Sequence, residues 1–443
     1  MRVIILGFLT LLSSFAFSQT KEFTLDNGLK VVVKEDHRAP VVISMIWYKV
    51  GSADEKGGST GLSHALEHMM FKGTTKYPLG VFSKTIASLG GQENAFTNTD
   101  YTGYFEQLAK QHLKTSFELE ADRMQHLLLT DEEFGKEIKV IQEERRLRTD
   151  DNPQALTYER FMAAANLSAP YHHPVIGWMS DLHTMTAKDA RNWYNQYYAP
   201  NNATLVVVGD VKPQEVFTLA KRYFGGIKAK TVPLRKPQVE PPALGKKEVV
   251  VHAPAKIPML MLGYTVPTVN TVDNAKSNDP YALELAAGLL DSGDNGRLVK
   301  DMTRGNQTAS DTAILYNLYA RYQTQFTVYG TPSQNHTVED IKKGFLNQLN
   351  LLKTTIVSEQ ELQRIKTQII AQKVFERDSI YGQAQEIGTL ETVGLGWQVA
   401  DEYIERINKV TAEDIKRVAK QYFNNANLTQ AQLKPKDTPG QKQ

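Results

Sequence analysis

Short apolar runs along this chain are separated by longer segments in which apolar residues recur every third or fourth position. The first pattern is typical of β-strands and the second of amphipathic helices. Near the start, residues 23–26 and 29–34 predict two strands, because Asn27-Gly28 between β-rich runs is a strong hairpin signal. Residues 41–50, rich in β-branched and aromatic side chains, predict a further strand.

The next part of the chain predicts helices on either side of one extended stretch. The glycine-rich residues 57–61 lead into the first of these helices. In chain order we expect a helix containing His64-Ala-Leu-Glu67-His68, a short helix at 82–89, extended chain at 93–105, and long helices at 107–127 and 131–148.

Two sequence echoes indicate an internal duplication. Thr186-Ala-Lys-Asp189 and Thr411-Ala-Glu-Asp414 each offer a capping box, and each leads to a similar Asn-Asn-Ala segment. A second echo, with nearly the same offset, pairs residues 131–134 with 358–362 ahead of long helices. We therefore predict an α+β fold with two homologous α/β-sandwich domains, each a mixed sheet with helices packed on one face.

The boundary between the two domains is predicted at residues 231–247. Four prolines in this stretch favour a stiff, extended connection that contributes to neither helix nor sheet. The N-terminal domain then covers residues 19–230 and the C-terminal domain 248–433. Residues 434–443 are polar and predict a tail.

The first eighteen residues have the features of a secretory signal. Arg2 precedes an apolar run at residues 3–12, and small residues stand at Ala16 and Ser18, so cleavage is expected before Gln19. The alternative is an uncleaved membrane anchor. The apolar run is shorter than the roughly 20 residues that a spanning helix needs, which favours cleavage. We expect no stable membrane span and an exported protein, in the periplasm.

Charge and cysteine content limit the kinds of partner and of metal ligand that the chain can have. The chain has 51 Lys and Arg against 49 Asp and Glu, so it gives no reason to expect nucleic acid or an anionic membrane as partner. It contains no cysteine. Disulfides are therefore excluded, and any metal site must use His, Asp and Glu.

The segment around residue 66 is the strongest candidate for chemistry. His64 and His68 are four residues apart, so on a helix both rings lie on one face and can hold one zinc ion. Glu67 lies on the same face and can take a proton from a metal-bound water without ligating the metal. Two His at this spacing also arise by chance in helices that bind no metal, so a third ligand is needed.

Acidic residues at 137–144 offer that ligand. Glu137 and Glu144 are seven apart and share one helix stripe, so we predict Glu144 as ligand and Glu137 as an acid that supports a ligand. Glu143 is the rival ligand, rotated about 100° from the stripe. The alternative is that these acids form a solvated face against the arginines at 145, 146 and 148.

These motifs together resemble the pitrilysin/insulinase (M16) family of zinc peptidases. Residues 61–74 read GLSHALEHMMFKGT, similar to the H-x-x-E-H signature of inverzincins, and residues 137–144 are similar to the family helix that carries the third ligand. The run Asn94-Ala95-Phe96-Thr97 is similar to the family strand that pairs with substrate. The resemblance covers about residues 20–430 and is closest to the short-chain branch with mitochondrial processing peptidase.

The resemblance implies a zinc metalloendopeptidase with a half-clamshell shape that cleaves peptides or unfolded segments in the cell envelope. His64, His68 and Glu144 would ligate one zinc ion per chain, with Glu67 and Glu137 as catalytic residues. The residues that bind substrate as an added strand would be Asn94, Ala95 and Phe96. The C-terminal domain would bind no zinc, because Gln372 stands where the first domain has Glu144.

One departure from the family bears on partners. The family commonly carries a Tyr near residue 310 that helps an Arg to position substrate, and residues 304–310 contain none; Tyr316 and Tyr319 fit that position poorly. We expect a homologous M16-like partner subunit, in a heterodimer, to supply the pair; a homodimer is the other possibility. The alternative functions are a non-catalytic scaffold subunit and a zinc-binding chaperone that holds peptides.

Overall fold

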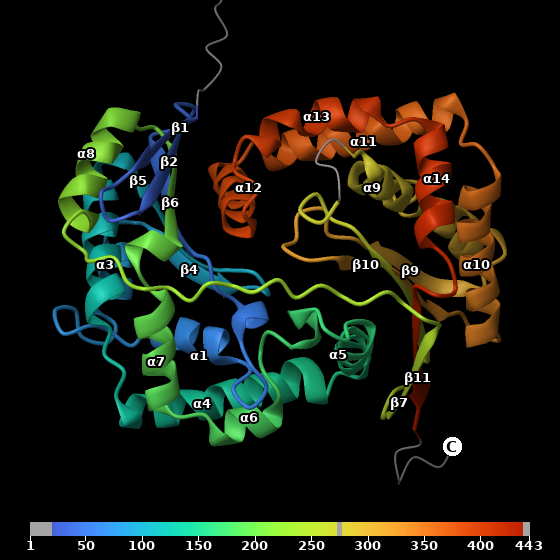
Figure 1. The fold of residues 1–443 in the computed structure, drawn as a ribbon, viewed down its shortest axis with the longest axis horizontal. Coiled ribbons are helices and arrows are strands. Elements are labelled where there is room, and N and C mark those ends of the chain that lie inside the picture. The colour runs from blue at the N-terminus through green and yellow to red at the C-terminus, as the bar shows by residue number, and fades with distance from the viewer. Residues whose placement is uncertain (1–19, 273–276, 437–443) are drawn as a thin grey trace, which may run out of the picture.

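The computed structural model describes residues 20–272 and 277–436 and consists of two α/β units joined by an extended segment (Figure 1). The secretory signal predicted at residues 1–18 lies outside the described residues. In the described part of the chain, no helix combines the length and apolar character that crossing a membrane requires.

The first unit is built on a six-stranded sheet with the order β1-β2-β6-β3-β5-β4. Strands β2 and β6 are parallel, and the other neighbours are antiparallel. The strands are β1 Lys21–Thr24, β2 Lys30–Glu35, β3 Val41–Tyr48, β4 Gln92–Thr97, β5 Thr102–Ala109 and β6 Ala203–Gly209. Strand β4 therefore forms one edge of the sheet.

The helices of the first unit follow the predicted order, with one correction. The helix expected from residue 107 begins at Leu113, because residues 102–109 pair with β3 as strand β5. The helices are α1 Leu62–Met69, α2 Val81–Ser88, α3 Leu113–His126, α4 Asp131–Arg145, α5 Pro153–Ala165, α6 Met179–Thr184, α7 Ala187–Tyr197 and α8 Pro213–Phe224. A π-helical turn at Arg146–Asp150 follows α4, so the helix expected to 148 changes form at its end.

The second unit has a five-stranded sheet with the order β7-β11-β8-β10-β9. Its strands are β7 Lys247–Ala253, β8 Met259–Val266, β9 Ala309–Leu315, β10 Thr324–Pro332 and β11 Leu428–Pro435. Its helices are α9 Asp279–Leu290, α10 Val338–Thr354, α11 Glu359–Glu376, α12 Ile380–Val393, α13 Val399–Lys409 and α14 Ala412–Tyr422. Strand β11 runs two residues into the stretch that the sequence predicted as a tail from 434.

The two sheets have the same topology apart from β1. Strands β7, β11, β8, β10 and β9 occupy the places of β2, β6, β3, β5 and β4, and the parallel pair β7–β11 matches β2–β6. Thr186 and Thr411 form the same capping box at the start of α7 and α14. The predicted α+β class with a duplicated α/β unit is confirmed.

One helix of each unit packs on the sheet of the other unit. Helix α12 packs on the face of β3 and β6, where Ala384 and Ile387 join the buried cluster around Trp47. Helix α5 packs on β7 and β11, where Phe161 joins a second cluster. Both sheet faces are therefore covered, one by the unit's own helices and one by the exchanged helix, as Figure 1 shows for α12.

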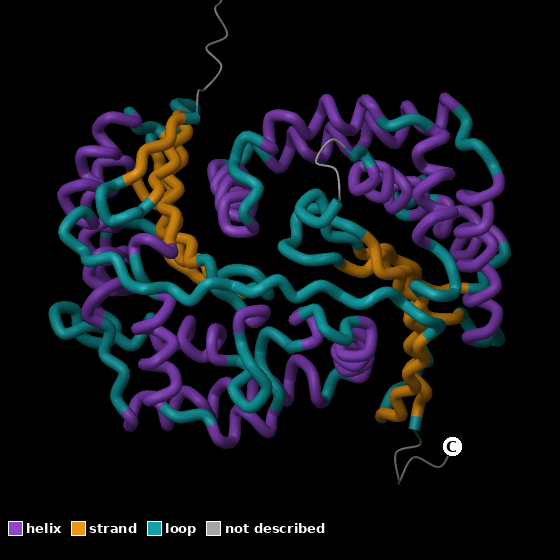
Figure 2. Tube along the Cα trace, in the orientation of Figure 1, coloured by secondary structure: helices purple, strands orange, loops and turns teal. Residues whose placement is uncertain are grey.

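The segment between the units is extended and attached at several points. Residues 228–244 contain neither helix nor strand, and Figure 2 shows them passing from one unit to the other. The Glu240 carboxylate accepts backbone N–H bonds from Leu167, Ser168 and Ala169, at 2.7–2.9 Å. Arg235 binds the carboxylate of Asp54. These contacts explain how a segment without secondary structure keeps a defined path.

Candidate active site

The start of helix α1 is held in place by the buried acid Glu55 and by Gly61. The Glu55 carboxylate accepts the backbone N–H groups of Gly61 and Ser63, each at 2.7 Å. Gly61 has φ 90°, and a Cβ there would lie 2.6 Å from the carbonyl oxygen of Ile176. Only glycine fits such a left-handed position so close to another backbone, so the glycine-rich entry directs α1 toward the site.

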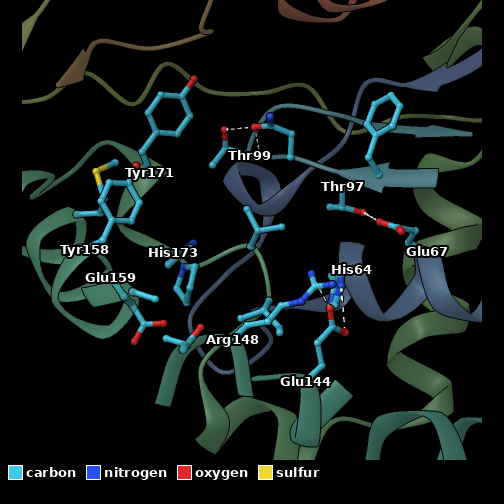
Figure 3. Close-up of a pocket in the computed structure, with 18 of the residues that line it drawn as sticks. His64, Glu67, Thr97, Thr99, Glu144, Arg148, Tyr158, Glu159, Tyr171 and His173 are labelled. Carbon is cyan, nitrogen blue, oxygen red and sulfur yellow. Dashed lines mark hydrogen bonds and ion pairs between the residues drawn. The ribbon is translucent and has the colours of Figure 1, made fainter. Parts of the chain in front are cut away.

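Helices α1 and α4 bring the three predicted metal ligands together. Nε2 of His64 lies 3.8 Å and Nε2 of His68 lies 3.4 Å from Oε2 of Glu144. One ligand atom from each residue lies within 4.8 Å of the others, and no second such group occurs among the described residues. Figure 3 shows the Glu144 carboxylate beside His64 at the edge of the cavity.

Neighbouring charges orient the candidate ligands. Nδ1 of His68 lies 2.9 Å from Oε1 of Glu137, whose other oxygen binds Lys72 at 2.5 Å. Burial raises the pKa of Glu137, but the bonds to Lys72 and His68 outweigh it and leave this pKa lowered. The remaining oxygen of Glu144 lies 2.7 Å from Arg148. Glu137 thus holds a ligand from behind, as metal-site carboxylates commonly do.

The donor set fits a zinc ion. Burial, with the nearby His68 and Arg148, lowers the pKa of His64 to about 3, so its ring is neutral, the form that ligates metal. Two neutral imidazoles and one carboxylate oxygen are ligands that zinc accepts in a four-coordinate site with one open position. Glu143, the rival ligand, lies outside this group; its side chain is 65% exposed and binds Arg146.

Glu67 lies beside the ligand group and contacts the edge strand. Its Oε2 accepts a hydrogen bond from Oγ1 of Thr97 at 2.5 Å (Figure 3). Burial raises the pKa of the Glu67 carboxyl, and the Thr97 bond opposes this. Glu67 is not one of the three grouped ligands. Its placement suits a residue that handles protons rather than metal.

The predicted substrate residues lie on β4, at the sheet edge. Ala95 packs toward the core beneath α1, on the same face as Thr97. The ring of Phe96 lies on the opposite face, 5.0 Å from the ring of Trp47, over Gly103. Phe96 therefore anchors the strand, and it is the backbone of residues 94–97 that faces the open edge.

A cavity of about 1090 Å³ joins these features. Both units contribute to its wall: Asn94–Thr99 and the ligand group come from the first, and Asn317, Ala320 and Thr324 come from the second. The residues near 310 at which the family carries its Tyr are not among its lining residues. In that region Arg297 binds Glu361 at 2.6 Å, and the hydroxyl of Tyr316 donates to Pro267.

Sequence reasoning missed several contacts of this site. It predicted neither the bond of Thr97 to Glu67, nor the contact of Arg148 with the ligand Glu144, nor that of Lys72 with Glu137. Thr97 and Lys72 lie inside the quoted motifs, but a pattern does not reveal which partner a side chain meets. The lining residues from the second unit carried no sequence signal.

Comparison with known proteins accounts for both units. Residues 30–177 match the family described as insulinase (peptidase family M16), and residues 184–369 match the peptidase M16 inactive domain. The chain belongs to peptidase family M16. This M16 chain is 33% identical to the zinc protease PqqE of Helicobacter pylori, over 93% of its own length and 92% of that protein. It is 24% identical to the uncharacterized zinc protease YmxG of Bacillus subtilis, over 91% and 95% of the two chains.

One solved structure supports the same family, and a second shares the fold. A protease from Helicobacter pylori superposes with a TM-score of 0.89 at 32% identity, covering 94% of this M16 chain and all of that one. The first half of the periplasmic protease PqqL from Escherichia coli has the same fold, with a TM-score of 0.76 at 19% identity, over 94% and 91% of the two chains.

Proposed function

We propose that this M16 chain is a zinc metalloendopeptidase that hydrolyses peptides or unfolded protein segments. The observation that carries the proposal is the grouping of His64, His68 and Glu144 on a cavity wall, with the Glu67 carboxylate beside them. Relatives named as zinc proteases support it. The reaction is hydrolysis of a backbone amide.

The proposed chemistry divides among a few side chains. His64, His68 and Glu144 would hold the zinc ion, which when bound supplies a Lewis acid for the water and the scissile carbonyl. Glu67 accepts the proton of the attacking water and later returns it to the nitrogen of the leaving amine. Thr97 orients Glu67 through its hydrogen bond. Glu137 orients His68.

The substrate is proposed to add a strand to the edge of the first sheet. Strand β4 pairs with β5 on one side only, so its outer edge can take an extended peptide. The Ala95 N–H donates to the Asn94 side-chain oxygen at 2.9 Å, a bond that it would exchange for a peptide carbonyl. Such pairing recognises backbone more than side chains. An unfolded segment can lie along residues 94–96, whereas a segment inside a folded domain must first leave its own sheet or helix.

A homologous partner subunit, or a second copy of the chain, is proposed to complete the site. Arg297 and Tyr316, in the region where the family supplies an Arg and Tyr, bind other groups of the second unit. The chain matches 91% of the first half of PqqL but 48% of the whole of that protein. This supports a chain that corresponds to one half of a larger enclosure.

Export to the periplasm is proposed on the sequence of residues 1–18. An apolar run after Arg2 and the small residues before Gln19 are the support. Sequencing the N-terminus of the chain from the periplasmic fraction tests it, with Gln19 as the expected first residue.

The deciding experiment uses an unstructured fluorogenic peptide, with and without a chelator. Cleavage should stop when zinc is removed and return when zinc is restored. Glu67→Gln should keep one zinc per chain and lower kcat about 10²–10⁴-fold, because the general base is gone.

Two other outcomes would favour a different role for Glu67 or a different function. Loss of zinc from Glu67→Gln would make Glu67 a ligand instead of a base. Binding of the peptide without cleavage, even with a partner present, would favour the chaperone or the scaffold subunit.

A further inference from the structure

The second unit reaches the active site through the loop between β9 and β10, residues 316–323. Arg321 at the tip of this loop is almost fully enclosed, with its side chain 10% exposed. Its Nη1 lies 3.1 and 3.2 Å from the two carboxylate oxygens of Asp54. Its Nη2 donates to the backbone carbonyl of Asp100. One guanidinium of the second unit therefore binds two segments of the first.

Tyr171 links the loop 316–323 to Asp100. Its hydroxyl donates to Oδ2 of Asp100 at 2.6 Å and accepts the backbone N–H groups of Arg321 at 2.9 Å and Tyr322 at 3.1 Å. The rings of Tyr171 and Tyr322 pack edge to face, 5.5 Å apart. Two of the three hydrogen bonds of this hydroxyl therefore cross the boundary between the units, and the third fixes Asp100 within the first unit.

Asp100 ends the turn that follows the substrate strand. The carbonyl oxygens of Asn98 and Thr99 in that turn accept the N–H groups of Ser52 at 3.2 Å and Ala53 at 2.8 Å. A Cβ at Gly51 would lie 2.4 Å from the Asn98 oxygen, so the turn is pressed against this segment. The segment 51–54 therefore holds the turn at residues 98 and 99, and Arg321 holds it at Asp100 while also binding Asp54 of that segment.

The turn continues directly into the catalytic contact. Thr97, the last residue of β4, donates to Glu67, and Asn98 and Thr99 follow it along the cavity wall. Asn317, Ala320 and Thr324 of the second unit form the wall nearby. An extended peptide bound along β4 would run past Thr97 into this part of the cavity.

We propose that Arg321 is a positioning residue for the reaction, and that its loop makes one end of the substrate-binding cleft. Arg321 fixes the turn 98–100, and the turn fixes the end of β4 and the Thr97–Glu67 contact. The second unit, which contributes none of the three grouped ligands, thereby governs how well the first unit uses long substrates. The proposal rests on the peptidase function proposed above.

The test compares Arg321→Lys and Tyr171→Phe with the wild-type chain. A cleavage site is first mapped in β-casein, an unstructured protein, and nested peptides around it are then shortened from either end. In the wild type, extension at the end that reaches loop 316–323 should raise kcat/KM. Both variants should lose this gain, about 10-fold, because misplacement of a binding element by a fraction of an ångström is costly.

Arg38→Ala is the matched control. Arg38 also joins the units, binding Asp36 of the first and the Asp378 carbonyl of the second at 2.6 Å, but it does not line the cavity. It should leave the length dependence unchanged. Zinc content and melting temperature are measured for all variants, so that loss of the metal or of the fold is recognised.

The outcomes separate this inference from the proposed function. If the wild type cleaves no peptide, even with a homologous partner subunit present, the proposed function fails. If the wild type cleaves, but Arg321→Lys and Tyr171→Phe lower kcat/KM equally for all lengths or not at all, the positioning role is wrong. A loss confined to one end of the nested series supports it.

Discussion

At the residue scale, neighbouring acids of the same type have different surroundings. Glu144 lies within 3.8 Å of both candidate histidine ligands, whereas Glu143 points outward and binds Arg146. Glu137, about two turns earlier on the same helix stripe, contacts His68 from behind. The helical turn of about 100° per residue separates these roles, because it decides which side chains of α4 face α1.

Glu144→Ala should abolish zinc binding, whereas Glu143→Ala should leave it unchanged. Removal of one of three ligands opens the coordination shell, and Glu143 contributes nothing to it in this arrangement. Glu137→Gln should weaken zinc binding about 10–100-fold, the usual effect of losing a partner of a ligand. Zinc titration with a competing chelator measures all three.

Zinc binding by Glu143→Ala is the measurement that could contradict this assignment. If Glu143→Ala released zinc as completely as Glu144→Ala, the assignment of the third ligand would be wrong. Circular dichroism of each variant serves as the folding control.

At the element scale, two glycines make the exchange of helices possible. A Cβ on Gly388 of α12 would lie 1.9 Å from the buried Trp47 ring on β3. A Cβ on Gly263 of β8 would lie 2.2 Å from the Phe161 ring of α5. In each case a large aromatic ring occupies the space left by a glycine, so helix and sheet approach closely across the boundary between the units.

Gly388→Ala should therefore destabilise the fold. Overpacking of a filled interior typically costs about 1–3 kcal/mol, more than the helix propensity that alanine gains. Gly135→Ala is the matched control, because Gly135 also lies in a helix, α4, and has no atom within 4 Å of an added Cβ. It should stabilise by about 0.5–1 kcal/mol.

Urea unfolding curves compare the two variants with the wild type. Equal changes in the free energy of unfolding would mean that α12 does not pack on Trp47 as described. The activity of Gly135→Ala should not change.

At the scale of the whole molecule, the cavity is built by both units, and residues 304–310, where the resemblance places a Tyr, are not among its lining residues. The exchanged helices, the attached linker and Arg321 join the units into one frame around the site. We propose that this frame is completed by a partner subunit.

The purified chain alone should show a small part of full activity, about 1% or less, since loss of one group that stabilises the developing oxyanion costs about 10²–10³ in kcat. Addition of a homologous subunit that carries the Arg and Tyr should restore the rate. Kinetics on a fluorogenic peptide, combined with sedimentation, measures activity and assembly together. Full activity from a monomeric single chain would refute the need for a partner, and full activity from a homodimer would identify the second copy as that partner.

By itself, the sequence determined the features that depend on local spacing. The i,i+4 histidines, the seven-residue step from Glu137 to Glu144, the capping boxes and the Asn27-Gly28 hairpin follow from helix and turn geometry within a few residues. The repeated order of these signals also predicted the duplicated α/β fold. The start of the helix at 107 was assigned wrongly, because residues 107–109 pair with β3 as the end of β5 and residues 110–112 form a short 3-10 turn.

Only the tertiary structure decided which distant residues meet. The approach of α4 to α1, the Thr97 bond to Glu67, the exchange of α5 and α12, and the insertion of Arg321 beside Asp100 all join residues far apart in the chain. Such contacts depend on how whole elements pack, and packing is set by the sum of many small interactions across the molecule. No single stretch of sequence records that sum.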